Sequence, residues 1–140
     1  MSPSPWFEFT IRVRYQETDQ MGVVYHANYL NWFEIGRTEL IRSLGMPYQT
    51  IEECGLLLPV IDAELKFRQP AKYDDIVTIR TRVEEYTHLR MRFASEIRRG
   101  EELLVTGGTR HIWLNRDWKP TRIDKAAPEL YKLLQKLPEA

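Results

Sequence analysis

The sequence predicts an α+β fold, and three features of its pattern lead to that prediction. Residues 7–14, FEFTIRVR, alternate between apolar and polar side chains, as a strand with one buried side does. A long segment of helical spacing follows at residues 27–45, and four strand-like segments come after it. Because consecutive strands joined by short turns form an antiparallel sheet, the class is α+β.

The helical segment, ANYLNWFEIGRTELIRSLG, carries an apolar stripe wide enough for a helix buried on most of its circumference. Its apolar positions are Tyr29, Trp32, Phe33, Gly36, Leu40, Ile41 and Leu44. Gly45 is a natural stop for this helix. Gly36 in mid-helix costs about 1 kcal/mol relative to Ala, which is acceptable if another element must approach that face closely.

The predicted strands after the helix cover residues 58–70, 74–86, 89–98 and 103–115. A short helix and turn at 46–55 precede them, and a surface helix at 127–138 closes the chain with Pro128 in its first turn. The alternation in 74–86 predicts a buried face made of Val77, Ile79, Thr81 and Val83. Gly107 and Gly108 indicate a bulge or a close backbone approach. The economical arrangement wraps the curved sheet around the long helix, and pairing with a second copy would cover its exposed edges.

Composition narrows the classes of function. The 140 residues are expected to form one domain, 1–140, and Lys+Arg 20 balance Asp+Glu 20. This balance gives no electrostatic footprint for nucleic acid or for an anionic membrane. Cys54 is the single cysteine, no run is long enough to span a bilayer, and no signal-peptide pattern occurs, so we expect a cytoplasmic protein. No metal-ligand spacing such as HExxH or paired CxxC is present, and we expect no metal and no cofactor.

The stretch 15–26, YQETDQMGVVYH, is the candidate for chemistry. Asp19 beside Gly22 could simply cap a turn, and the residue types alone favour that interpretation. Asp19 also lies just before the buried helix, whose free N–H groups and positive dipole end favour a developing negative charge. A carboxylate beside such a terminus could therefore act on a carbonyl group while the terminus stabilises the oxyanion.

Two segments resemble a known family. VRYQETDQMGVVYHANYLNWFEIGR at 13–37, followed by FRQPAKYDDIVTIRTRV at 67–83, is similar to the 4-hydroxybenzoyl-CoA thioesterase-like branch of the hotdog-fold acyl-CoA thioesterases. The resemblance covers essentially the whole chain. It implies a hotdog fold, acyl-CoA as the substrate, no metal, and a site shared between two subunits of a homo-oligomer, with dimers that often assemble into tetramers.

The resemblance places the catalytic carboxylate on Asp19 and the position at the start of the helix on His26. Asp19 would act as nucleophile or general base, and main-chain N–H groups near His26 would bind the oxyanion, with the His26 side chain assisting. Glu17 is assigned a structural or solvated role, and His88 and His111 are assigned structural roles. Tyr25, Asn28 and Arg90 are assigned to substrate binding. Asn28 could also cap the helix, which its residue type favours. Arg90 shares a strand face with Arg92 and is the candidate for the CoA phosphates, although a solvated face explains the pair equally well.

Two other functions fit the same sequence. An enzyme of this fold could take acyl-carrier-protein thioesters instead of acyl-CoA, and a non-catalytic module could bind acyl-CoA without cleaving it. The acyl group itself is not determined by the sequence, because side chains from several segments and from another subunit set the depth of the pocket.

Overall fold

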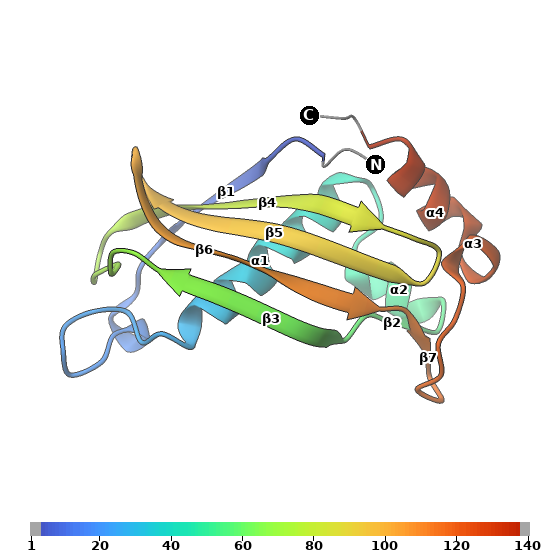
Figure 1. The fold of residues 1–140 in the computed structure, drawn as a ribbon, viewed down its shortest axis with the longest axis horizontal. Coiled ribbons are helices and arrows are strands. Elements are labelled where there is room, and N and C mark those ends of the chain that lie inside the picture. Colours follow the sequence, from blue (N-terminus) through green and yellow to red (C-terminus); the bar gives the residue numbers. More distant parts are fainter. Residues whose placement is uncertain (1–3, 138–140) are drawn as a thin grey trace.

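The computed structural model describes residues 4–137, and these form a five-stranded antiparallel sheet wrapped around helix α1 (Asn28–Ser43) (Figure 1). Across the sheet the strands follow the order β1-β4-β5-β6-β3. Their bounds are Phe7–Arg12 for β1, Val60–Phe67 for β3, Ile76–Tyr86 for β4, Arg90–Arg99 for β5 and Glu102–Ile112 for β6. The predicted α+β class, with an antiparallel sheet around a long central helix, is confirmed.

Smaller elements complete the fold. They are the 3₁₀ turn η1 (Tyr15–Glu17), helices α2 (Tyr48–Glu53), α3 (Ile123–Ala126) and α4 (Pro128–Gln135), and the short strands β2 (Leu56–Leu57) and β7 (Leu114–Asn115). Strands β2 and β7 pair with each other outside the main sheet. The sequence predicted α2 and α4 but not α3 or the β2–β7 pair, which are too short to show a period. Pro138, the last residue of the predicted C-terminal segment, lies outside the described residues.

Helix α1 lies close against the sheet because small residues stand at the points of contact. A Cβ atom added to Gly36 would collide with the side chains of Thr81 and Ile79 on β4. One added to Gly107 of β6 would collide with the Glu64 carbonyl of β3 and lie 3.0 Å from the ring of Phe33. The β3–β6 register is continuous through Gly107, so the glycine there serves a close approach and not a bulge.

The interior between α1 and the sheet contains two apolar clusters. One cluster includes Trp32, Phe33, Ile79 and Ile97 and lies toward the start of α1. The other includes Leu40, Ile41, Phe93 and Trp113 and is closed by Leu130 and Leu134 of α4. The alternation predicted for the segment 74–86 is confirmed, since Val77, Ile79, Thr81 and Val83 are all buried.

Strand β3 forms one edge of the sheet and leaves apolar side chains in solvent. Val60, Ile61 and Phe67 are each about half exposed, at 46%, 51% and 55%. The first two stand at one end of the strand and Phe67 stands at the other. None of the described helices is long and apolar enough to cross a membrane.

Candidate active site

The loop that precedes α1 folds back on itself and holds Asp19 near its tip. The Asp19 N–H donates to the Val23 carbonyl at 2.9 Å, and the Gly22 N–H donates to the Asp19 carbonyl at 3.0 Å. Gly22 has a φ of 80°, a left-handed conformation that glycine adopts without steric cost. One carboxylate oxygen of Asp19, Oδ1, accepts a hydrogen bond from the Met21 N–H at 2.9 Å. The turn-capping role is therefore present in the structure, and it uses only one of the two carboxylate oxygens.

Glu17 anchors this loop to the helix. Its carboxylate is buried, with Oε2 accepting from the indole N–H of Trp32 at 2.7 Å and Oε1 accepting from the Arg14 N–H at 2.8 Å. Its main-chain carbonyl accepts from the Tyr25 N–H at 2.9 Å and from the Asn28 side-chain amide at 2.9 Å. The structural role predicted for Glu17 is confirmed, because every one of these bonds is made to another part of the same loop or to α1.

Asp19 and His26 line one pocket of about 230 Å³. Its other walls come from the loop, from α1 and from the segment at the end of β3, and the lining residues are Met21, Val23, Val24, Tyr29, Phe67, Arg68, Gln69 and Pro70. The His26 ring lies 4.7 Å from the ring of Tyr25 and 6.4 Å, edge-on, from the ring of Phe67. The buried Tyr29 supports the floor, since its hydroxyl accepts from the Ala71 N–H at 3.1 Å. The pocket thus combines an apolar wall with a carboxylate and an imidazole.

The main chain at the start of α1 offers hydrogen-bond donors beside this pocket. The N–H groups of Asn28, Tyr29 and Leu30 donate to carbonyls of residues 25–27, and the N–H groups of Val24 and Tyr25 donate to Ala71 and Glu17. Within the described part of the chain, the N–H groups of His26 and Ala27 have no hydrogen-bond acceptor. These are the donors that a ligand oxygen in the pocket could use.

Two of the residues assigned to substrate binding lie next to the pocket and not in its wall. Tyr25 is 48% exposed, and its ring is tilted by 50° against the His26 ring. Asn28 does not cap α1, contrary to the expectation from its residue type. It is the first residue of the helix, the capping position falls on Ala27, and the Asn28 amide donates to the Glu17 carbonyl instead. Within one chain, Asn28 therefore fixes the loop that carries Asp19.

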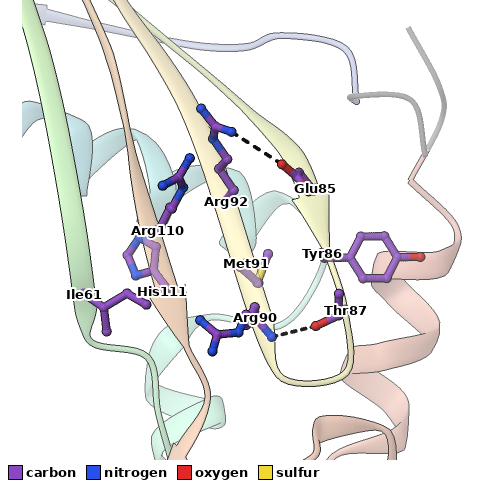
Figure 2. Close-up of a pocket in the computed structure, with 9 residues that line it drawn as sticks. All are labelled: Ile61, Glu85, Tyr86, Thr87, Arg90, Met91, Arg92, Arg110 and His111. Atoms are coloured by element: carbon purple, nitrogen blue, oxygen red, sulfur yellow. Dashed lines mark hydrogen bonds and ion pairs between the residues drawn. The ribbon is translucent and has the colours of Figure 1, made fainter.

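Arg90 lies far from Asp19 in the same chain. It begins β5 opposite Ile112 of β6. Phe67 of the Asp19 pocket lies on β3 and pairs with Val105 of β6, and Val105 in turn pairs with Ile97 of β5. The seven residues from Arg90 to Ile97 separate the two places by about 23 Å along the strand. Arg90 lines a second pocket, of about 160 Å³, with Ile61, Glu85, Tyr86, Thr87, Met91, Arg92, Arg110 and His111 (Figure 2).

The three arginines of this second pocket differ in their partners. Arg92 lies within 3.5–3.8 Å of carboxylate oxygens of Glu64, Glu84 and Glu85, and Arg110 pairs with Asp62 at 3.3 Å. The Arg90 guanidinium forms no ion pair with any residue that the structure describes. Its main chain is bonded to Thr87, with the Arg90 N–H donating to Thr87 Oγ1 at 3.0 Å and the Arg90 carbonyl accepting from the Thr87 N–H at 2.8 Å (Figure 2). Arg90 is therefore the arginine with charge available for a ligand.

Sequence reasoning did not identify the far wall of the Asp19 pocket. Phe67, Arg68, Gln69 and Pro70 follow Leu65 of β3 and come from a segment more than forty residues after Asp19. The signal that could have found them is the second family-like segment, which begins at Phe67. No group of three or more His, Cys, Asp or Glu side chains among residues 4–137 is placed to hold a metal ion.

Comparisons with known proteins identify the family of the chain. The model of the thioesterase-like superfamily matches residues 13–134. The putative acyl-CoA thioesterase YneP of Bacillus subtilis is 38% identical over 128 residues, which cover 90% of this chain and 93% of that protein. The acyl-CoA thioesterase YbgC of Haemophilus influenzae is 38% identical over 99 residues, or 70% of this chain and 73% of that one.

A solved structure gives the same result for the fold. The DHNA-CoA thioesterase of Staphylococcus aureus superimposes with a TM-score of 0.90 at 37% identity, over 94% of this chain and 89% of that chain. The chain therefore belongs to the thioesterase-like superfamily, and it is a thioester hydrolase of the hotdog-fold acyl-CoA thioesterase family.

Proposed function

We propose that this enzyme hydrolyses acyl-CoA to a free carboxylic acid and CoA, with Asp19 as the reacting carboxylate. The observation that carries the proposal is the placement of Asp19 and His26 in one pocket beside main-chain N–H groups at the start of α1. The relatives support the substrate class, since YneP and YbgC are named acyl-CoA thioesterases and the staphylococcal structure is named for a CoA thioester.

The chemistry requires a carboxylate and an oxyanion site. As general base, Asp19 takes a proton from water while the water oxygen bonds to the thioester carbon and the carbonyl electrons move onto oxygen. As nucleophile, Asp19 itself bonds to that carbon, and water cleaves the resulting anhydride in a second step. In both routes the oxyanion is bound by the N–H groups of His26 and Ala27, the carbon–sulfur bond breaks, and the thiolate of CoA takes up a proton.

The His26 side chain assists in this proposal by facing the same pocket. Its ring lies between the rings of Tyr25 and Phe67, and it would polarise the thioester carbonyl from there. Tyr25 would contact the substrate at the mouth of the pocket, and Asn28 would act through the loop it anchors.

A two-fold dimer would bring Arg90 of one chain to the Asp19 pocket of its partner. Ile61, at one end of β3, lines the Arg90 pocket, and Phe67, at the other end, lines the Asp19 pocket. Antiparallel pairing of β3 with its copy reverses the strand direction, so the Ile61 end of one chain lies beside the Phe67 end of the other. The exposed apolar ends of β3 support this edge as the dimer contact. We propose that the dimer, and a tetramer built from it, places Arg90 at the phosphates of CoA.

We also propose that the enzyme is cytoplasmic, with which a single cysteine is compatible. The enzyme would need no cofactor, because the carboxylate and the N–H groups supply the two needs of the reaction.

A turnover screen tests the proposed function. The purified enzyme is offered a series of aliphatic acyl-CoA thioesters, benzoyl-CoA, and acyl groups carried on acyl-carrier protein. Release of free thiol from acyl-CoA, lost in Asp19→Asn, is the expected result. Turnover of carrier-bound acyl groups alone would assign the enzyme to carrier-protein thioesters. Binding of acyl-CoA without any thiol release would make the chain a non-catalytic module.

A further inference from the structure

A third cavity, of about 200 Å³, lies between α1, α2 and the segment that leads into β3. It is lined by Glu34, Arg37, Tyr48, Ile51, Glu52, Leu56, Leu57 and Leu58, and it shares no lining residue with the Asp19 pocket or the Arg90 pocket. Pockets for drug-sized ligands are larger, at roughly 300–1,000 Å³. This cavity is therefore suited to a smaller group than an acyl-CoA.

Arg37 is a buried cation that faces this cavity without an ionic partner. It is only 7% exposed, and its guanidinium forms no ion pair with a carboxylate of the described residues, among which Glu34 acts on it only at a distance. Its Nη1 donates a long bond of 3.4 Å to Thr109 Oγ1, and its Nε is buried with no hydrogen-bond acceptor. Buried charges in proteins are normally paired, because an uncompensated one is strongly destabilising.

The groups around Arg37 do not supply the missing negative charge. His111, on β6, bonds Thr109 Oγ1 at 2.8 Å and the Leu58 carbonyl at 3.2 Å. Burial, and then the nearby Arg37, lower the pKa of His111 to about 4, so it is neutral at pH 7. Tyr48 keeps its proton as well, since burial raises its pKa.

The nearest acid is Glu34, one turn before Arg37 on the same helix. Its side chain is exposed at the rim of the cavity and is not in contact with the guanidinium. Burial lowers the pKa of Arg37, and Tyr48 and Glu34 oppose that shift. Glu34 therefore acts on Arg37 through space, and the side-chain hydrogen bond to the guanidinium comes from the neutral Tyr48 hydroxyl, which brings no charge.

We propose that the Arg37 cavity binds the carboxylate of a small organic acid. The planar guanidinium matches a carboxylate in geometry and charge. The Tyr48 hydroxyl supplies a further donor, and Ile51, Leu56 and Leu58 receive the apolar body of the acid. Small organic acids include the product of acyl-CoA hydrolysis, and only this link to the product rests on the proposed function. The carboxylate could come from a free acid or from the far end of a dicarboxylic acyl group.

Calorimetric titration with benzoate tests the site, with benzamide as the neutral isostere. Benzoate should bind the wild-type enzyme and benzamide should not. Arg37→Gln should weaken benzoate binding at least about tenfold, because a charge-assisted bond is lost. Glu34→Gln should tighten it by roughly twofold or more, because a like charge at the rim is removed. Arg42→Gln is the matched control, since Arg42 is an exposed arginine of the same helix paired with Glu39, and it should leave binding unchanged.

Equal affinity for benzoate and benzamide, or an unchanged affinity in folded Arg37→Gln, would overturn the proposal. If Arg37→Gln does not fold, the affinity for benzoate is measured in Glu34→Gln and in Tyr48→Phe instead. An affinity unchanged from wild type in both variants would overturn the proposal. The titrations are repeated in Asp19→Asn, so that they do not depend on turnover.

Two further arms separate the sources of the carboxylate and the two proposals. If the wild-type enzyme hydrolyses glutaryl-CoA faster than butyryl-CoA and Arg37→Gln does not, the cavity binds the far carboxylate of the acyl group. If the wild-type enzyme shows no such preference but still binds benzoate, the cavity binds a free acid. Turnover without benzoate binding overturns the Arg37 site alone, and benzoate binding without turnover of any acyl-CoA overturns the proposed function alone.

Discussion

The indole N–H of Trp32 donates to the carboxylate of Glu17 at 2.7 Å, and this bond joins the loop that carries Asp19 to the buried face of α1. The partners are fifteen residues apart in sequence. Trp32 is fully buried, so the carboxylate is fixed by a side chain that cannot move independently of the core. The position of Asp19 thus depends on a contact two residues away from it in sequence, made inside the protein.

Glu17→Gln should lower kcat and stability together. The amide has one acceptor oxygen where the carboxylate has two, so either Trp32 or the Arg14 N–H loses its partner, at a cost of roughly 1–3 kcal/mol. The loop would be held less firmly, while the apolar walls that bind the acyl group would remain. We therefore expect a larger change in kcat than in KM, measured by steady-state kinetics and urea unfolding.

Trp32→Phe removes the same bond from the other side and keeps an aromatic ring. In the double variant with Glu17→Gln, the further loss of kcat and of stability should be smaller than the loss that Trp32→Phe causes alone, because the shared interaction is already gone. Glu102→Gln is the control, an exposed carboxylate paired with Arg99 at the surface. Wild-type kcat in a stable Glu17→Gln variant would remove Glu17 from any role in positioning Asp19.

Asp19→Asn should abolish most turnover and leave the fold intact. Asn retains an oxygen that can accept from the Met21 N–H, so the turn survives, but it can be neither nucleophile nor base. The loss should be at least about 10²-fold in kcat, or roughly 2.7 kcal/mol of barrier. His26→Ala should cost less, because the main-chain donors remain. An Asn variant that melts normally and turns over at the wild-type rate would make Asp19 a turn residue only.

Arg90→Glu should raise KM for acyl-CoA more than for a short thioester without the nucleotide. The expected change is roughly fivefold, which matches about 1 kcal/mol for an exposed charge contact. Arg42→Glu serves as the control for a general effect of surface charge. If KM rises equally for both thioesters, Arg90 does not meet the nucleotide end of CoA.

Self-association should depend on the β3 edge. We expect the 16.7 kDa chain to sediment as a dimer or tetramer at micromolar concentration, and Ile61→Lys to shift it toward the monomer, since a charge on an edge strand opposes pairing. Turnover should fall when the dimer is lost, because the proposed site takes Arg90 from the partner. A fully active wild-type monomer would contradict the shared site.

Stability should fall as the pH is lowered from 6.5 toward 4. Burial, and then Arg37, lower the pKa of His111 from 6.5 to about 4, so in that window the unfolded chain binds a proton that the folded chain does not. The loss from His111 should reach roughly 3 kcal/mol once the pH is near the folded pKa. Urea unfolding at several pH values measures it, and His111→Gln should flatten the dependence in this window. An unchanged slope in that variant would show that other groups cause it.

The sequence by itself determined the main elements and the loop that carries Asp19. Alternation and helical spacing report which face of each strand or helix is buried, and that is a local property, so the buried face of β4 and the stripe of α1 could be predicted from residue order. The motif around Asp19 and His26 could also be predicted, because its members lie within a few residues of one another.

Only the tertiary structure decided which distant side chains meet. Asn28 has the residue type of a helix cap, but the chain is already helical at Ala27. The Asn28 side-chain amide instead donates to the Glu17 carbonyl. Arg90 has the right strand face for a phosphate ligand, but the register places it at the other end of the sheet from Asp19. The neutral His111 and the unpaired Arg37 arise from packing between α1 and β6. Periodicity cannot encode such contacts, because each is set by the pairing and spacing of elements far apart in the chain.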